Sequence, residues 1–368
     1  MNRAFRFAAL TLLLNLFLSG CSRNQEQGLS QRQIERLVLA ASPHVDSPDI
    51  WARAIRESLQ ELGQPVDKGH ACAVISVIAQ ESSFKTVPKN SGMPNILRKK
   101  IENASSNLIV QQLIQLRLDQ HAANGNTFRE NIDSIKSERD FELWYNEFTS
   151  ASVTKPILIV FNKDISDLVT TLGSMQVSVK FAEHYPKKPK NVGSGSIREI
   201  LYTCKGGVFY GAARLLDYKH NYDDWKYVFA DYNAGRYSSR NAGFQKMLAR
   251  VARKTVDLDG DLLSYENGKG VPSATYASFI ELLKDREIAF DEEKIRKDFE
   301  KEKRYSFEKT WSYKTLAEMY KKKCGRTIYA VLPEISLHSP KFASKNLTTK
   351  WFANRVKGRF IHCMRTRI

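Results

Sequence analysis

The feature that most constrains the fold is residues 71–84, a stretch that is apolar almost all the way round a helix. Such a helix has to be surrounded by other elements, because a surface helix keeps a polar face. Just upstream, residues 47–63 have the apolar spacing of an amphipathic helix, with Ser47 and Pro48 as its cap and first turn. The pattern predicts a mainly helical core built around residues 71–84.

One carboxyl continues the apolar face of that helix. Glu81 follows Val74, Val77 and Ile78 by seven, four and three residues, which places it on their side. We expect loss of solvation to raise the pKa of this carboxyl, so that it holds a proton near neutral pH as a general acid must. The alternative is a glutamate at a helix end whose side chain reaches water.

The rest of the chain also favours helices, and no internal repeat is evident. Helical patterns occur at residues 108–118, 140–148, 208–216, 225–232 and 241–256. The β-branched run at 157–161 predicts a strand, and the segment 186–195 is rich in Pro, Lys, Gly and Ser, as loops are. Residues 281–304 hold 17 charged side chains of both signs, which predicts a solvated helix face.

The N-terminus has the order of a secretory signal. Arg3 and Arg6 precede an apolar run at residues 7–18, which is too short to span a bilayer as a helix and ends in Leu-Ser-Gly-Cys. That ending resembles a bacterial lipobox, in which Cys21 would be diacylated and become the first mature residue. We therefore expect a lipoprotein signal peptide at residues 1–20.

Residues 21–40 are then expected to be the lipidated cysteine and its tether. Ser22 follows Cys21 and no Asp stands there, which resembles the sorting pattern of outer-membrane lipoproteins. Nothing after residue 21 has the unbroken apolar length of a spanning helix. The expected location is the outer membrane, reached through the lipid on Cys21, with the body facing the periplasm rather than the cell surface.

Four further cysteines leave their pairing open. An oxidising periplasm permits disulfides. Four cysteines can pair in three ways, and the sequence does not choose among them; they are Cys72, Cys204, Cys324 and Cys363. Buried free thiols are the alternative. No cysteine or histidine spacing indicates zinc. The run from Asp257 to Asp261 has the glycine of a calcium loop two places early, so a capped turn is favoured and no metal is expected.

The positive charge of the chain is concentrated at its end. The net charge is +17, and residues 321–368 contain twelve Lys and Arg against the single acid Glu334. A nucleic-acid-binding domain would spread its cations over the main domain, so nucleic acid is not an expected partner. We expect Trp351, Phe352 and Phe360 to pack on the domain while the cations stay solvated, available to anionic envelope components.

Two further segments supply polar groups. In Gly-Ser-Met-Gln-Val, starting at residue 173, Met175 offers a soft apolar contact and Gln176 both donates and accepts hydrogen bonds. In Asp-Tyr-Asn-Ala-Gly, starting at residue 231, a helix is expected to end at Gly235 and to leave Tyr232 and Asn233 in its last turn. Polar groups beside an apolar carboxyl suit an uncharged, hydroxyl-rich ligand such as a sugar.

Taken in order, these motifs resemble the lytic transglycosylases of the lysozyme-like superfamily. That family has Glu-Ser in an apolar helix, then Gly-Leu-Met-Gln, a glycine-rich helix start and Ala-Tyr-Asn-Ala-Gly. The resemblance implies a lysozyme-like domain over residues 41–250, with a large insertion at about 92–170 because the first two motifs are far apart. Residues 251–368 would form a C-terminal accessory region, basic at 321–368.

The resemblance also implies a function. Glu81 would cleave the bond between N-acetylmuramic acid and N-acetylglucosamine in peptidoglycan, acting as acid and then as base, with a 1,6-anhydro product and no cofactor. Met175, Gln176, Tyr232 and Asn233 would line the sugar site, and Ser82 would help to position it. The alternative is a non-catalytic glycan-binding or adaptor lipoprotein that keeps the fold and contacts an envelope protein.

Longer stretches resemble a second family, the uncharacterised YaiW-type outer-membrane lipoproteins. They include the eleven residues from Tyr232, the Leu-Asp-Gly-Asp-Leu-Leu from Leu258 and the Leu-Thr-Thr-Lys-Trp-Phe from Leu347. This resemblance runs from about residue 40 to the C-terminus. It implies relationship more than mechanism.

Overall fold

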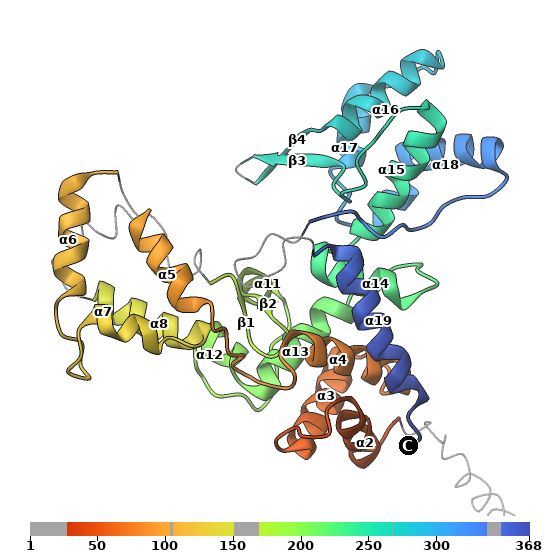
Figure 1. Ribbon diagram of the computed structural model, residues 1–368. Helices are drawn as coiled ribbons and strands as arrows, with labels where there is room; N and C mark the ends of the chain where they lie inside the picture. Colours follow the sequence, from red (N-terminus) through yellow and green to blue (C-terminus); the bar gives the residue numbers. More distant parts are fainter. Residues whose placement is uncertain (1–27, 104–105, 151–168, 267, 337–346) are drawn as a thin grey trace, which may run out of the picture.

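The computed structural model describes residues 28–103, 106–150, 169–266, 268–336 and 347–368. The fold is mainly helical, which confirms the predicted class, and its helices gather around two separate hydrophobic clusters (Figure 1). The expected signal peptide, Cys21 and the predicted strand at 157–161 lie outside the described residues. Among the described residues, no helix has both the length and the apolar character needed to cross a bilayer.

The first cluster is built by helices from the two ends and the middle of the chain. They are α2 (Gln31–Ala41), α3 (Pro48–Leu62), α4 (Lys68–Glu81), α11 (Val179–His184), α12 (Ile197–Leu201), α13 (Cys204–Leu216), α14 (Trp225–Ala234) and α19 (Thr349–Arg365). The predicted helices at 47–63, 208–216 and 225–232 are thus confirmed as α3, α13 and α14. Ser47 occupies the cap position of α3 but makes no side-chain cap, and Pro48 is the first helical residue.

The central helix of this cluster is α4, as the apolar stretch predicted. Every residue from Ala71 to Ala79 is buried, and the side chain of Asp67 caps the start by accepting from the His70 amide at 2.8 Å. The helix ends at Glu81, three residues before the predicted end. The reason is that Ser83 and Phe84 have left-handed backbones, with φ of 51° and 61°, and a right-handed helix cannot continue through them.

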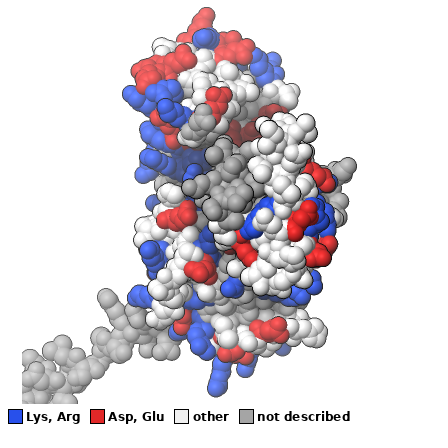
Figure 2. All heavy atoms as spheres, turned by 90° about the vertical axis from the view of Figure 1, so that its left-hand side faces the viewer, with Lys and Arg blue, Asp and Glu red and all other residues white. Residues whose placement is uncertain are grey.

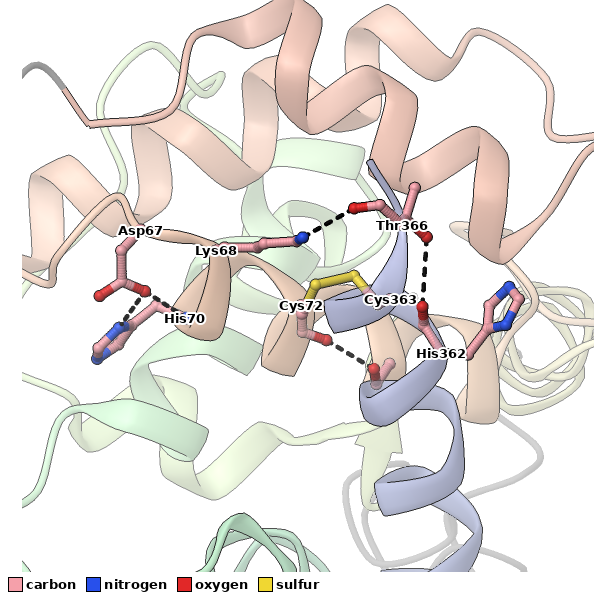
Figure 3. The surroundings of a disulfide bond; sticks show 8 residues. Asp67, Lys68, His70, Cys72, His362, Cys363 and Thr366 are labelled. Atoms are coloured by element: carbon pink, nitrogen blue, oxygen red, sulfur yellow. Dashed lines mark hydrogen bonds and ion pairs between the residues drawn. A yellow bond between two sulfur atoms is a disulfide. The ribbon is translucent and has the colours of Figure 1, made fainter. Parts of the chain in front are cut away.

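A disulfide joins the two ends of the described chain. Cys72 of α4 and Cys363 of α19 are bonded across 291 residues, and the ammonium of Lys68 donates to the Thr366 carbonyl at 2.7 Å beside them (Figure 3). Cys204 and Cys324 are free thiols. One disulfide and two free thiols therefore coexist.

Helix α19 is an integral part of the first cluster. Phe352 and Phe360 are buried in it and Trp351 packs against it partly buried, which confirms that the tail aromatics pack on the domain. Residues 251–368 are consequently distributed over both clusters, because the chain returns to the first one after leaving the second. Helix α19 lies along α4 and α14, and the C-terminus ends beside α2 (Figure 1).

The predicted insertion projects from the other helices of the first cluster, and its buried side chains, such as Phe128, belong to that cluster (Figure 1). Its described elements are α5 (Met93–Glu102), α6 (Leu108–Leu118), α7 (Phe128–Asn131), η1 (Ile132–Ser134) and α8 (Glu138–Thr149). The rings of Trp144 and Phe148 stack at 4.7 Å in its small core, and Glu142 forms an ion pair with Arg198 of α12. Large areas without Lys, Arg, Asp or Glu cover this part in Figure 2. Leu108 of α6 is one of its exposed apolar residues.

The second cluster follows α14 in the chain. Its elements are α15 (Ser238–Ala252), β3 (Leu263–Glu266), β4 (Lys269–Pro272), α16 (Ala274–Asp285), α17 (Glu292–Phe299), η3 (Tyr305–Lys309) and α18 (Trp311–Cys324). β3 and β4 form an antiparallel hairpin in which Leu263 pairs with Pro272. The charged segment 281–304 is split between the end of α16 and α17, so it is not one helix, and Phe299 within it is fully buried.

The acidic run before β3 is a turn, as favoured from the sequence. The Asp259 carboxylate accepts from the Asp261 amide at 3.0 Å and from the Gln245 side chain at 2.6 Å. In the part of the chain that the structure describes, no three acidic, histidine or cysteine side chains are grouped as metal ligands.

Candidate functional site

The structure brings together the three sequence segments that the motifs marked. The Tyr232 hydroxyl donates to the Met175 carbonyl at 2.6 Å, which joins the end of α14 to the turn between β1 (Thr171–Leu172) and β2 (Val177–Ser178). Burial and the nearby carboxylate of Glu81 raise the pKa of Tyr232. Segments separated by more than fifty residues thus meet at the C-terminal end of α4.

Glu81 is the last residue of α4 and is partly exposed. The preceding residue, Gln80, accepts a hydrogen bond from the Arg359 guanidinium at 3.2 Å, so α19 contacts this end of the helix. After Glu81, the Ser82 hydroxyl donates to the Ile78 carbonyl at 3.2 Å. The left-handed backbones of Ser83 and Phe84 follow, so Glu81 stands at a helix end with partial exposure to water, as in the alternative drawn from the sequence.

The turn that carries Met175 and Gln176 has an unusual backbone. Gly173 has a φ of 77°, and a Cβ there would lie 2.2 Å from the Leu201 carbonyl oxygen. Gln176 also has a positive φ, 50°, and its amide N–H donates to the Gly173 carbonyl at 3.1 Å. Because only glycine fits the first of these positions, the turn presents Gln176 in one conformation.

Met175 is fully buried against the glycine-rich helix α13. A Cβ on Gly211 would lie 2.2 Å from the Met175 sulfur, so this glycine lets the turn and the helix come together. Helix α13 begins at Cys204 with Thr203 as its cap, so Gly206 and Gly207 lie in its first turn, as the glycine-rich helix start predicted.

At the end of α14, Tyr232 and Asn233 are fixed by neighbouring helices. The Arg214 guanidinium donates to the Tyr232 carbonyl through Nε and Nη2, at 3.1 and 2.9 Å. The Asn233 side-chain oxygen accepts from the Thr349 hydroxyl of α19 at 3.0 Å. Gly235 then ends the helix with a φ of 117°, as predicted.

Asp231 has a structural role that the sequence analysis missed. Its carboxylate is fully buried and accepts from the Tyr237 and Ser239 amides, both at 2.7 Å, and from the Tyr222 hydroxyl at 2.7 Å. It fixes the turn between α14 and α15, next to Tyr232. The signal available in the sequence was an acid that directly follows the apolar run Val228 to Ala230 of a helix, where burial requires hydrogen-bond donors.

The six residues predicted for the site divide by exposure. Glu81, Gln176 and Asn233 are partly exposed, whereas Ser82, Met175 and Tyr232 are buried. The first three thus have solvent-accessible side chains, and the other three pack behind the surface. Arg214, Thr349 and Arg359 also hold this region, and nothing in the local sequence around them marked them out.

Comparison with known proteins gives a family without an assigned activity. A family model described as "Protein of unknown function (DUF1615)" matches residues 44–366. The chain is similar to the uncharacterised protein YaiW of Escherichia coli (strain K12), with 30% identity over 374 residues that cover 99% of this chain and all of that protein. No solved structure matches.

Proposed function

The chain belongs to the DUF1615 family, and we propose that it is a peptidoglycan lytic transglycosylase that uses Glu81 as its only catalytic carboxyl. The observation that supports this most is that burial and the charge of Glu81 raise the pKa of Tyr232, whose hydroxyl donates to the Met175 carbonyl at 2.6 Å. Three motifs that resemble those of transglycosylases thus converge at one place. We propose accordingly that the helices around α4 form a lysozyme-like domain.

In the proposed reaction Glu81 acts twice. Its carboxylic acid first gives its proton to the glycosidic oxygen, the bond from that oxygen to the muramoyl C1 breaks, and an oxocarbenium-like centre forms at C1. The Glu81 carboxylate then takes the proton of the muramoyl C6 hydroxyl, whose oxygen bonds to C1 and closes the anhydro ring. Glu81 ends protonated and no water is consumed, so no second carboxylate is required, unlike in ordinary glycosidases.

We propose that Gln176 and Asn233 bind the sugar hydroxyls and N-acetyl groups. Both carry amide side chains that donate and accept, and both are partly exposed. Ser82, Met175 and Tyr232 are proposed to hold the end of α4 and the β1–β2 turn in place from behind. Their burial supports that division of roles.

We propose that the protein is held at the outer membrane by lipid on Cys21, with the body in the periplasm. The lipobox-like ending of the apolar N-terminal run supports this proposal. A disulfide in the folded chain fits an oxidising compartment. Mass spectrometry of the mature N-terminus tests it: a diacylated Cys21 is expected, and a Cys21→Ala variant should leave the membrane fraction.

The activity is tested with purified sacculi. Wild type should release 1,6-anhydromuropeptides, and Glu81→Gln should release none, because the amide cannot transfer a proton. Glu102→Gln, an exposed glutamate of α5, is the matched control and should behave as wild type. Wild type that releases no anhydromuropeptide, while a known transglycosylase does so in parallel, would show the proposal to be wrong.

A second candidate function is non-catalytic glycan binding or an adaptor role for an envelope protein. It is favoured by the internal hydrogen bonds of the amides: Gln176 donates to the Gly173 carbonyl at 3.2 Å, and Asn233 accepts from Thr349. A protein of this kind would bind sacculi equally well with Glu81 or Gln at position 81 and would release no product.

A further inference from the structure

The basic tail of the sequence is divided in space, and one part joins cations from elsewhere. Lys323 lies in the last turn of helix α18, whereas Lys350 and Arg355 lie on α19 in the other cluster. Near Lys323 are Arg250 and Arg253 at the end of α15 and Arg286 at the end of α16. These four residues are called the basic cluster below.

The positions of the cluster side chains follow from helix packing. The ammonium of Lys323 donates to the Arg250 carbonyl at 2.7 Å, which fixes the end of α18 against the end of α15. Arg253 is the residue after α15 and has a left-handed backbone, φ 57°, which turns the chain there. Arg286 is the corresponding residue after α16. All four are exposed to solvent.

The cations of the cluster have no carboxylate partners. Within the described ranges, no ion pair joins any of the four to an acid; the nearby Lys254 is the one neutralised, by Glu281. Desolvation and the charges of Arg253, Arg250 and Arg286 lower the pKa of Lys323. The negative ends of three helix dipoles stabilise such cations in part. The remaining mutual repulsion is relieved when an anion binds.

We infer that Arg250, Arg253, Arg286 and Lys323 form a binding site for carboxylate groups of peptidoglycan stem peptides. Guanidinium groups suit this ligand, because each can donate two parallel hydrogen bonds to a carboxylate. The choice of polymer rests on the proposed function, in which peptidoglycan is the substrate. The basic cluster would then hold the sacculus at a second place, distant from Glu81.

The position of the cluster favours peptidoglycan over the anchoring membrane. Only six residues lie between the proposed lipidated Cys21 and Gly28, where the described chain begins, and seven Cα–Cα steps reach about 25 Å at most. Gly28 leads into α2, and α15, α16 and α18 lie at the opposite end of the molecule (Figure 1). A chain anchored at its N-terminus would therefore point the basic cluster away from its own membrane.

The test compares sacculus binding by two variants of equal charge, both made in the Glu81→Gln background so that the polymer is not consumed. The cluster variant is Arg250→Gln, Arg253→Gln, Arg286→Gln and Lys323→Gln. The control variant removes four exposed cations of the C-terminal segment: Lys350→Gln, Arg355→Gln, Arg365→Gln and Arg367→Gln. Cosedimentation with sacculi and with anionic phosphatidylglycerol vesicles, across a salt series, is the measurement.

We expect the cluster variant to bind sacculi about tenfold more weakly than its Glu81→Gln parent near 0.1 M salt, and its binding to depend less on salt. The affinity of the control variant should stay within about twofold of that parent. A third variant with Lys at the three arginine positions checks folding and should recover part of the binding. Equal losses in both variants, no loss in the cluster variant, or a loss confined to vesicles would overturn the inference. None of these readouts requires turnover, so absence of lytic activity would refute the proposed function separately.

Discussion

Removal of the disulfide is expected to destabilise the whole first cluster. Cys72 and Cys363 are both fully buried, and their bond closes a loop across 291 residues. The chain-entropy relation gives about 19 cal/mol/K for a loop of this length, or roughly 5.7 kcal/mol at room temperature. Measured losses fall below that ceiling, so Cys72→Ser with Cys363→Ser should lower the free energy of unfolding by about 3–5 kcal/mol.

The assay is urea unfolding of the mature chain, followed by tryptophan fluorescence. A matched control is Cys204→Ser with Cys324→Ser, which removes the two free thiols and should cost much less. Burial raises the pKa of Cys204 to about 12, so that thiol should also react slowly with alkylating reagents in the folded state. With the Cys21 sulfur blocked by lipid, denatured but unreduced wild type should titrate as two thiols, and as four after reduction.

Two results would refute this reasoning. One is a disulfide variant whose free energy of unfolding lies within about 1 kcal/mol of wild type, because the loop and the burial both require a larger loss. The other is a count of four thiols before reduction, which would mean that α19 is held against α4 by non-covalent contacts alone.

Three other perturbations have defined outcomes. Gly173→Ala should lower the free energy of unfolding by about 2–4 kcal/mol in a urea titration, since its Cβ would meet a carbonyl oxygen at 2.2 Å. Gly193→Ala is the control and should change little, because the space around Gly193 is open. Tyr232→Phe should cost about 1–2 kcal/mol, because a buried carbonyl loses its donor, and should reduce lytic activity. Desolvation raises the pKa of Asp224, but a backbone N–H and the ammonium of Lys357 outweigh it, so the pKa is lowered. The contribution of Asp224 to the free energy of unfolding is therefore present above about pH 4 and is lost as the pH falls through the folded pKa. Asp224→Asn should remove that part of the pH dependence of stability.

The sequence predicted the features that depend on local spacing. Residues 71–84 are apolar on almost every side of the helix, which predicted α4 as the central helix, because a helix without a polar face has to be buried. Gly235 marked the end of α14 for a similar reason, since a positive φ favours glycine. The predicted end of α4 is three residues too late, because the left-handed backbones that end the helix occur at Ser83 and Phe84, and the sequence has no glycine there to indicate them.

Features that depend on distant segments could not be predicted. The partner of Cys72 is 291 residues away, and nothing local to either cysteine distinguishes the three pairings. The contacts of α19 with Gln80 and Asn233 are of the same kind, because they exist only once the chain has returned from the second cluster. The basic cluster likewise joins the ends of three helices, and a count of charges along the sequence does not show that these ends lie close together.

In the proposed reaction, one carboxyl cleaves the glycan by closing a ring on the sugar itself. The most direct test is digestion of sacculi by wild type in water enriched in the heavy oxygen isotope, with the released muropeptides measured by mass spectrometry. We expect products that carry no heavy oxygen from the solvent and are lighter by one water than hydrolysis products. Glu81→Gln should release none. Products labelled by the solvent, or equal release from Glu81→Gln, would contradict the proposed reaction.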